Sequence, residues 1–246
     1  MFKHDYKTIQ SLKHAKYRKI YNKFIIEGKR IIESALYCNK KLGPVFCTDN
    51  FLKQNKTWIK KNFGDSKVIK TIDTKRFKRV SETKSPQGIF TVCNIPQNSR
   101  PDLSLDKWVY LDKISNPGNI GTLMRSCAWF GIDNIALSSG CVDPYNSKSV
   151  RSAMGAHFTV TINRNINLSY FKKTHRIIAA NLNGVNASDY EFPDKFVLVL
   201  GNEAHGISYK NLKYIEENIS VFKIGSGNSL NVSTAGSILM YLIMNN

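Results

Sequence analysis

The sequence contains no apolar run long enough to cross a membrane. The most apolar stretch among its 246 residues, from Ile238 to Met244, has seven residues, whereas a transmembrane helix needs about 18. The first residues, MFKHD, also lack the apolar segment of a secretory signal. Neither membrane insertion nor secretion is therefore indicated, and we expect a cytoplasmic protein without a membrane partner.

Cysteine is scarce and shows no paired spacing. The five cysteines are odd in number and no two of them form a C-x-x-C pair. Scattered cysteines of this kind are typical of reduced intracellular thiols rather than of a disulfide framework or a zinc site. We therefore expect neither disulfides nor a bound metal. The cysteines are at positions 38, 47, 93, 127 and 141.

Acidic residues are few, and most of the excess of basic over acidic residues lies in one part of the chain. Lys+Arg number 36 and Asp+Glu 18, a net charge of +18. Such an excess indicates a polyanionic partner, either nucleic acid or an anionic membrane surface. Residues 1–100 hold 23 Lys+Arg and 7 Asp+Glu, a net of +16, and the remaining 13 and 11 give +2. This asymmetry predicts a domain boundary near residue 100.

A basic cluster near the N-terminus contains interleaved aromatic residues. Lysines neutralise phosphates while rings stack on unpaired bases, so this composition favours RNA. A solvated helix face is the alternative interpretation, but a second basic cluster at residues 75–79 argues against a chance distribution. The RNA-binding candidates of the first cluster are Lys13, Lys16, Arg18, Lys19 and Lys23, with Tyr17 and Tyr21 between them.

Short apolar strands alternate with helical patterns along the whole chain, which predicts an α/β fold with two domains. Residues 1–95 form a small α/β domain, the Pro- and Asn-containing residues 96–105 a linker, and residues 106–246 a domain with a mostly parallel sheet. Predicted strands in the first domain are 24–26, 45–47 and 89–93, beside a helix at 8–21. Those in the second are 108–111, 134–137, 157–162, 176–181, 196–200 and 220–224, with a C-terminal helix at 229–244.

Three loops that follow predicted strands contain unusual polar residues. Ligands of parallel sheets bind beyond the carboxyl ends of the strands. None of the loops matches a P-loop or a G-x-G-x-x-G fingerprint, and each alone is also compatible with a turn, a helix cap or a surface cation. The loops are Asn119-Ile120-Gly121 with Arg125 after it, Leu200-Gly201-Asn202-Glu203, and Ser229-Leu230-Asn231-Val232-Ser233.

Together, and in this order, the loops resemble the signature motifs of the SpoU-type RNA 2′-O-ribose methyltransferases of the SPOUT superfamily. Residues 151–156 (RSAMGA) resemble the stretch between the first two motifs. Residues 24–28 (FIIEG) and 85–88 (SPQG) are similar to the ribosomal-protein-like substrate-binding domain of many members. The resemblance covers nearly the whole chain, and it implies a deep C-terminal trefoil knot and a homodimer with the active sites near its interface.

The resemblance also implies the chemistry. It predicts transfer of a methyl group from S-adenosylmethionine to a ribose 2′-hydroxyl of RNA, with ribosomal RNA favoured over transfer RNA. It assigns catalytic roles to Asn119, Arg125, Glu203, Ser229 and Asn231, cofactor contacts to Leu200, Gly201, Ile224 and Leu230, and RNA contact to Arg151. The family's arginine is proposed to accept the hydroxyl proton, but a guanidinium has a pKa above about 12. Either the pKa of Arg125 is depressed, or Arg125 orients the nucleophile while a phosphate takes the proton.

The third motif departs from the family pattern. Gly225 follows Ile224 where members have a proline, and four residues separate Ile224 from Ser229. Because glycine is more mobile than proline, cofactor affinity is the property most affected. Two alternatives remain: a catalytically silent RNA-binding or ribosome-assembly factor on the same scaffold, and a methyltransferase acting on bases. Retention of the polar catalytic set favours an enzyme over the silent factor, and analysis of the methylated product would distinguish ribose from base.

Overall fold

The computed structural model describes residues 5–64 and 68–245. It divides into two compact units, which are described separately. Unit 1 comprises Met1–Gln97 and Tyr145–Phe158, and unit 2 comprises Asn98–Pro144 and Thr159–Asn246. Within the described ranges no helix is long and apolar enough to span a bilayer. Residues 1–4, on which the absence of a signal segment was argued, lie outside those ranges.

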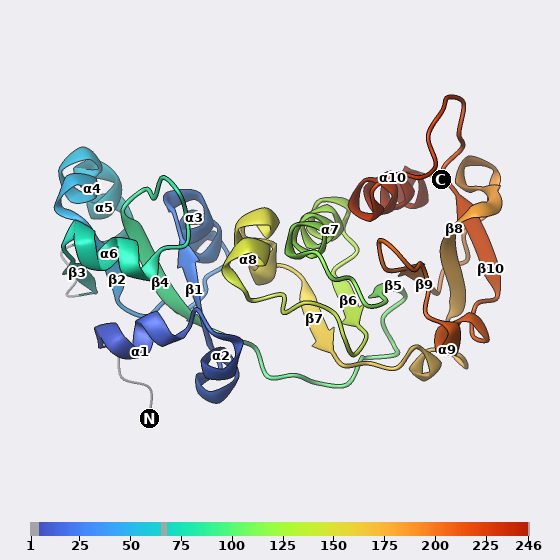
Figure 1. Ribbon diagram of the computed structural model, residues 1–246, viewed down its shortest axis with the longest axis horizontal. Helices are drawn as coiled ribbons and strands as arrows, with labels where there is room; N and C mark the ends of the chain where they lie inside the picture. Colours follow the sequence, from blue (N-terminus) through green and yellow to red (C-terminus); the bar gives the residue numbers. More distant parts are fainter. Residues whose placement is uncertain (1–4, 65–67, 246) are drawn as a thin grey trace. The chain divides into compact units, whose positions relative to one another are not determined.

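Unit 1 contains a four-stranded sheet in the order β1-β4-β2-β3 (Figure 1). The predicted strands at 24–26, 45–47 and 89–93 are confirmed, and the unit is the small α/β domain expected. Strand β4 is antiparallel to β1 and β2, and β2 is parallel to β3. The strands are β1 (Lys23–Glu27), β2 (Val45–Cys47), β3 (Ile69–Thr71) and β4 (Ile89–Asn94). The helices are α1 (Tyr6–Ser11), α2 (Ala15–Tyr21), α3 (Lys29–Tyr37), α4 (Asp49–Gln54), α5 (Lys56–Phe63), α6 (Thr74–Val80) and α8 (Ser147–Ala153), with the 3-10 turn η1 (Ala156–Phe158).

The helix predicted at 8–21 is broken into α1 and α2. Asp5 caps α1 by accepting from the backbone N–H of Thr8 at 2.8 Å. At the break, the guanidinium of Arg18 donates to the backbone carbonyls of Leu12 and Lys13 at 2.8 and 2.7 Å. The carbonyls that end α1 therefore find a side-chain partner instead of continuing the helix.

The segment Tyr145–Phe158, which lies between two strands of the second domain in the sequence, packs into unit 1. The ring of Phe24 on β1 lies 5.0 Å from that of Tyr145 and 5.7 Å from that of His157. Gly155 comes so close to Ser34 on α3 that a Cβ there would lie 2.5 Å from the serine Cβ. The sequence predicted that residues 145–158 belong to the domain at 106–246. The prediction differs from the structure because a hydrophobic pattern shows that a segment is buried but does not show which core it joins.

Unit 2 contains a six-stranded sheet in the order β10-β8-β9-β5-β6-β7, in which every pair of neighbours is parallel. The predicted parallel sheet is confirmed, although two boundaries differ: the strand expected at 157–162 is η1 followed by β7, and the strand expected at 220–224 ends at Ser220. The strands are β5 (Lys107–Leu111), β6 (Asn134–Leu137), β7 (Thr161–Arg164), β8 (Arg176–Asn186), β9 (Phe196–Leu200) and β10 (Glu217–Ser220).

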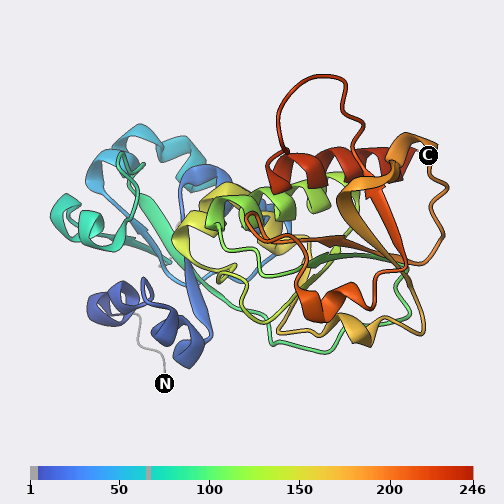
Figure 2. The same cartoon turned by 45° about the vertical axis from the view of Figure 1, so that its right-hand side comes forward.

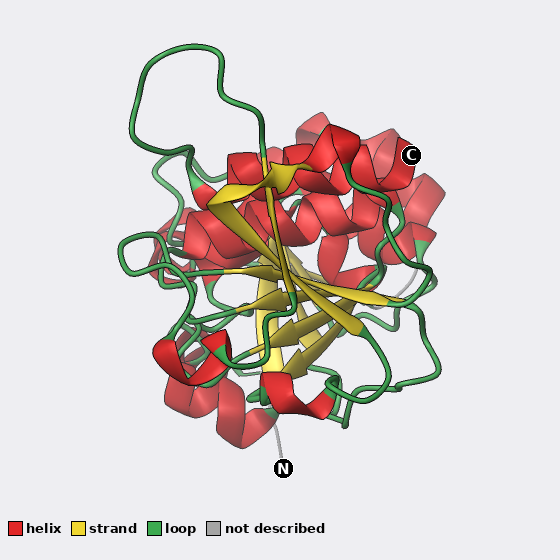
Figure 3. Cartoon of the chain, turned by 90° about the vertical axis from the view of Figure 1, so that its right-hand side faces the viewer, coloured by secondary structure: helices red, strands yellow, loops and turns green. Residues whose placement is uncertain are grey.

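Helices cover both faces of this sheet (Figure 3). On one face α7 (Pro117–Phe130) and α10 (Val232–Asn245) pack side by side (Figures 1 and 2). The other face carries α9 (Tyr209–Leu212) and the 3-10 turn η2 (Leu168–Tyr170), and its core includes Trp108 and Phe171 with ring centroids 5.2 Å apart. The 3-10 turn η3 (Ala187–Asp189) contacts α10. Strands β5 and β9 are buried on both sides and lie at the centre of the sheet, so the loops that follow them begin from a rigid support.

Candidate functional site

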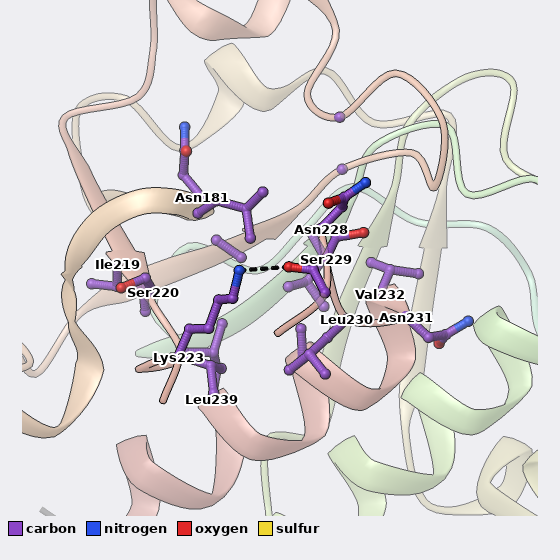
Figure 4. Close-up of a pocket in the computed structure, with 18 of the residues that line it drawn as sticks. Asn181, Ile219, Ser220, Lys223, Asn228, Ser229, Leu230, Asn231, Val232 and Leu239 are labelled. Atoms are coloured by element: carbon purple, nitrogen blue, oxygen red, sulfur yellow. Dashed lines mark hydrogen bonds between the residues drawn. The ribbon is translucent and has the colours of Figure 1, made fainter. Parts of the chain in front are cut away.

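The three polar loops meet beside a cavity of about 710 Å³ (Figure 4). Of the predicted catalytic and cofactor residues, all but Asn119 and Arg125 line it. The lining comes from the middle of β8 at 180–182, residues 200–203 and 206–207 of the second loop, the end of β10 and the third loop at 219–231, and three residues of α10, which are Val232, Ala235 and Leu239. The carboxyl-end position is the one expected for a ligand site in a parallel sheet.

The second loop depends on a close backbone approach at Gly201. The N–H groups of Asn202 and Gly206 each donate to the other residue's carbonyl at 2.9 Å, which closes the loop into a narrow turn. A Cβ at Gly201 would lie 2.4 Å from the carbonyl carbon of Gly206 and 2.6 Å from the nitrogen of Ile207. Only glycine fits this position, because backbone atoms on the opposite side of the turn cannot move away.

Glu203 joins the second loop to the start of α7. Its Oε1 accepts from the Asn119 side-chain amide at 2.9 Å and from the Asn116 N–H at 3.1 Å, and its Oε2 accepts from the Ser115 N–H and hydroxyl at 3.3 and 3.1 Å. Burial raises the pKa of the Glu203 carboxyl, but these hydrogen bonds outweigh burial and hold the pKa below its usual value. The carboxylate therefore binds the amide-rich N-terminus of α7 as an anion.

Asn119 connects the first loop to the third. Its Oδ1 accepts from the Asn231 side-chain amide at 3.1 Å and from the Ser233 hydroxyl at 3.4 Å. Asn231 in turn accepts from the Ser233 N–H at 2.8 Å, which satisfies a free donor in the first turn of α10. The buried Asn119 thus bonds to Glu203 with its amide nitrogen and to α10 with its oxygen, so one side chain links all three loops.

Arg125 lies elsewhere on α7. Arg125 follows Asn119 by six residues, which is one and two-thirds turns of an α-helix. The two side chains therefore lie on different faces of α7, and Arg125 points away from the network. Its side chain is exposed, as are those of Thr122 and Trp129 on the same helix, and the exposed fraction of Trp129 is 80%. Within one chain, Arg125 does not line the cavity.

The third loop carries Ile224 beyond its strand, where it lines the cavity. Because β10 ends at Ser220, Ile224 lies four residues into the loop and its side chain is 90% exposed. Val221 directly follows the strand, is half-buried and lines the cavity. The sequence prediction missed this role because it placed Val221 within a strand at 220–224, whereas β10 ends at Ser220.

Lys223 is a further cavity residue that sequence reasoning missed. Its ammonium donates to the carbonyl of Gly227 at 2.6 Å, so that its side chain reaches across the third loop (Figure 4). Ser229 and Leu230 follow on the far side of the loop; Ser229 is exposed, and the exposed fraction of Leu230 is 50%. Ser229 lies three residues before α10, whose capping residue is Asn231, so the helix predicted from 229 begins later than expected.

The basic candidates in unit 1 divide into exposed and structural residues. Lys16 and Lys19 on α2 are exposed, whereas Arg18 is only 5% exposed and bonds to the end of α1. The assignment of Arg18 as an RNA contact is therefore corrected: its guanidinium is committed to backbone carbonyls. Lys13 donates to the carbonyl of Ser81 at 3.3 Å, and Lys23 donates to the side chain of Asn94.

Lys13 links the first basic cluster to the end of α6, which carries the second, because its ammonium donates to the carbonyl of Ser81 directly after that helix. Helix α1 packs against α6, where the Tyr6 hydroxyl donates to the carbonyl of Arg76 at 3.3 Å. Between the basic residues of α2, the rings of Tyr17 and Tyr21 are stacked with centroids 6.3 Å apart. We call the exposed basic residues of α2 and α6 the basic face of unit 1. They are Lys16, Lys19, Lys75, Arg76, Lys78 and Arg79.

Arg151 lies on α8 within unit 1 and is half-buried. Its charge acts on Glu27, at the end of β1. Burial raises the pKa of the Glu27 carboxyl, although the hydrogen bond from the Ser81 hydroxyl at 2.8 Å and the charge of Arg151 lower it. Arg151 is therefore directed at a carboxylate of its own unit.

The two segments that resembled a substrate-binding domain come together in unit 1. The N–H of Gly28 donates to the carbonyl of Ile89 at 3.0 Å, and the N–H of Lys29 donates to the side-chain oxygen of Gln87 at 2.8 Å. Gln87 therefore satisfies a free N–H in the first turn of α3. Residues 24–28 and 85–88 form one structural feature although about 60 residues separate them.

The thiols are free, and the described residues contain no group of three or more His, Cys, Asp or Glu side chains placed to hold a metal ion. Burial raises the pKa of the Cys47 and Cys93 thiols to about 12. These thiols are protonated at neutral pH and chemically inert.

Comparisons with known proteins agree with this arrangement. The model of the SpoU rRNA Methylase family matches residues 106–241, and the MRM3-like substrate binding domain matches residues 3–91. The 23S rRNA (guanosine(2553)-2′-O)-methyltransferase RlmP of Bacillus subtilis is 31% identical over 225 residues, which are 89% of this chain and 88% of that protein. The mitochondrial rRNA methyltransferase 3A of Danio rerio is 25% identical over 89% of this chain and 63% of its own length.

Solved structures share the fold along the whole chain. A protein of the TrmH family from Porphyromonas gingivalis superposes with a TM-score of 0.82 at 27% identity and covers 99% of this chain and 98% of its own. The SpoU methyltransferase AviRb from Streptomyces viridochromogenes, in complex with AdoMet, gives a TM-score of 0.84 at 20% identity over 99% and 97%. The second likeness concerns the fold alone.

Proposed function

This chain belongs to the SpoU rRNA methylase family, and from that premise we propose that it transfers the methyl group of S-adenosylmethionine to a ribose 2′-hydroxyl of ribosomal RNA. The observation that carries the proposal is the hydrogen-bonded network in which Asn119 joins Glu203 to Asn231 beside the cavity. A protein that only bound RNA would not need three separate loops held together around a small-molecule site.

The cavity is suited to S-adenosylmethionine. Its volume of about 710 Å³ lies within the range of roughly 300–1,000 Å³ typical of small-molecule sites. The lining combines exposed backbone at Gly201, Gly206 and Gly225 with apolar side chains such as Val221 and Leu230, and Glu203 places a carboxylate at its edge. When bound, the cofactor supplies an electrophilic methyl group, and the protein supplies its orientation.

The network residues position rather than react. Glu203 fixes the second loop against α7, Asn231 fixes the third loop against α10, and Asn119 holds the two together. Fixing the loops in advance places the donor and the attacking hydroxyl in line, which is the main source of acceleration in a group transfer of this kind. Leu200, Gly201, Val221, Ile224 and Leu230 are the proposed cofactor contacts, with Ser229 at the entrance.

Arg125 is proposed to act at the ribose of the active site in a second copy of this chain. It lies outside the cavity of its own chain, on a helix face shared with the exposed Trp129. On the adjacent α10, the exposed Tyr241 packs against Phe130 with ring centroids 6.0 Å apart. An exposed aromatic face across α7 and α10 supports a homodimer that buries it and brings Arg125 to the partner's cavity.

We extend the proposal to the organisation of the chain. Residues 1–95 bind the RNA substrate and residues 96–105 connect. Residues 106–246, apart from the segment 145–158 that packs into unit 1, form the catalytic domain with the deep trefoil knot of the family. The match of the SpoU rRNA Methylase family model to residues 106–241 supports this assignment. The enzyme is proposed to act in the cytoplasm, where its ribosomal substrate is made.

The basic face of unit 1 is the proposed RNA contact. Its lysines and arginines would neutralise phosphates, and the stacked Tyr17 and Tyr21 offer rings to unpaired bases. Lys13 and Lys23 lie beside it, and Arg151 lies within the same unit.

Methyl transfer from labelled S-adenosylmethionine to ribosomal RNA tests the proposal. We expect incorporation by the wild-type protein, recovery of the label as 2′-O-methylnucleosides after nuclease digestion and mass spectrometry, and a loss of at least about 100-fold in Arg125→Ala. Lys210→Ala, which removes an exposed cation from α9, is the matched control and should retain activity. RNA binding without incorporation would identify a silent binder, and a label on bases would contradict ribose methylation.

A further inference from the structure

A buried aspartate lies directly behind the second loop. Asp112 follows β5 and its side chain is completely buried. Its backbone N–H donates to the carbonyl of Leu200, the last residue of β9, at 2.8 Å. Asp112 therefore lies at the point from which the loop beginning at Gly201 departs, although it does not line the cavity.

The carboxylate of Asp112 holds the far end of the same loop. Its Oδ2 accepts from the backbone N–H of Ser208 at 2.8 Å and from the Ser208 hydroxyl at 2.6 Å. Ser208 precedes α9, and a serine at such a position commonly bonds to a free N–H of its own helix. Here its side chain makes no such capping bond, because the hydroxyl donates to Asp112 instead.

The next residue fixes the middle of the loop. The backbone carbonyl of Lys113 accepts from the side-chain amide of Asn202 at 2.7 Å. Residues 112 and 113 thus hold the second loop at three points: the strand end at Leu200, the turn at Asn202 and the helix start at Ser208. Leu200 and Asn202 line the cavity themselves, and the other lining residues of the loop, Gly201, Glu203, Gly206 and Ile207, each lie between two of these points.

Core stability alone does not account for this aspartate. Removing a carboxylate from water is costly unless both oxygens find partners. Among the described residues the second oxygen of Asp112, Oδ1, has no hydrogen-bond partner. An apolar side chain of similar volume would fill the space without that cost but would release Ser208.

We propose that Asp112 is a positioning residue for the cofactor, acting through Ser208 to hold the second loop in its binding conformation. The inference depends on the proposed function, since it supposes that the cavity binds S-adenosylmethionine. Asp112 touches neither the cofactor nor the ribose, so its loss acts on cofactor affinity and leaves the chemical step largely intact.

The test compares Asp112→Asn with Asp112→Ala in the full chain. The side-chain oxygen of asparagine can accept both hydrogen bonds that Ser208 donates. The side-chain nitrogen takes the place of Oδ1, which accepts no hydrogen bond, so the substitution removes no existing hydrogen bond. We expect Asp112→Ala to raise the KM for S-adenosylmethionine, and the Kd for S-adenosylhomocysteine in calorimetry, by about tenfold or more. We expect kcat at saturating cofactor to stay within about threefold. Asp112→Asn should restore both constants to near the wild-type values.

Two further variants keep the result interpretable. Ile135→Ala creates a cavity in unit 2 at β6, at a buried residue that neither lines the cofactor cavity nor belongs to the core against which Ile207 packs, and controls for lost stability. Ser208→Ala removes the hydroxyl while keeping the N–H, and should weaken cofactor binding less than Asp112→Ala does; it tests the contact even if Asp112→Ala does not fold. A wild-type protein that failed to bind S-adenosylhomocysteine would defeat the proposed function itself. Unchanged affinity in folded Asp112→Ala, an effect matched by Ile135→Ala, or an Asp112→Asn variant as weak as Asp112→Ala would overturn only this inference.

Discussion

At the scale of single residues, the site is defined by polar side chains that bind each other. Glu203 accepts four hydrogen bonds from the start of α7, and Asn119 uses both ends of its amide. Neither side chain is placed by its own loop alone. The amide groups of Asn119 and Asn231 are therefore as necessary to the cavity as the residues that line it.

The depressed pKa of Glu203 makes a pH-dependent prediction. Because the folded pKa lies below the unfolded value, Glu203 contributes stability above the unfolded pKa of about 4.3, and this contribution is lost as pH falls through the folded pKa. Wild type should exceed Glu203→Gln in free energy of unfolding near pH 6, and the difference should shrink as the pH falls below about 4.

Urea denaturation at several pH values measures this difference. Glu191→Gln, at an exposed loop position before β9, is the matched control and should give no such trend. A constant gap between wild type and Glu203→Gln across the pH range would contradict the role of the ionised carboxylate.

At the scale of elements, the crossing of α7 and α10 sets the spacing of the first and third loops. A Cβ at Gly236 would lie 2.6 Å from Leu123 of α7 and 2.7 Å from Leu200 of β9. The Ser126 and Ser237 hydroxyls, 2.6 Å apart, add a polar contact between the same helices. The glycine lets the two helices and the central strand approach closely.

Gly236→Ala should therefore destabilise the protein. Overpacking a core costs about 1–3 kcal/mol, which exceeds the gain of about 1 kcal/mol that alanine brings to a helix interior. Thermal and urea unfolding would measure the net loss. Gly225→Ala, where a Cβ meets nothing within 4 Å, should leave stability within about 0.5 kcal/mol; an equal effect of both variants would show that the close approach is not what matters.

The elements also show how far the sequence could predict the structure. Buried strands such as β5 and β9 were predicted because continuous apolar runs have few other interpretations. The end of β10 was misjudged because three of the four residues after Ser220, namely Val221, Phe222 and Ile224, are apolar although the strand pairing stops at Ser220. The loops and their polar residues were recognised by resemblance. The bonds between them were not, because hydrogen bonding between segments about 100 residues apart has no local pattern.

At the scale of the whole molecule, charge and catalysis belong to different parts of the chain, yet the chain does not divide at one point. The aromatic residues Tyr145 and His157 pack on Phe24 in unit 1, so a protein cut near Pro101 would deprive them of this partner. Separation of RNA binding from catalysis is therefore better tested by substitutions in the full chain than by truncation.

Removing two charges from the basic face should weaken RNA binding and its salt dependence. Lys16→Ala with Lys19→Ala should lower the slope of log affinity against log salt by about 0.7 for each phosphate of a single strand that is no longer neutralised. Affinity for S-adenosylhomocysteine should not change. The matched control removes Lys60 and Lys61, which are equally exposed on α5; if both pairs changed the slope alike, a specific basic face would be contradicted.

The central claim is that three loops, closed by a glycine turn and joined through Asn119, form the cofactor site. Calorimetric titration of S-adenosylhomocysteine into the wild-type protein and Gly201→Ala tests it most directly. The predicted result is one site per chain in the wild type and a loss of affinity of at least about 100-fold in Gly201→Ala, because its Cβ would meet backbone atoms of residues 206 and 207. Equal affinity of the two folded proteins would mean that the ligand binds elsewhere.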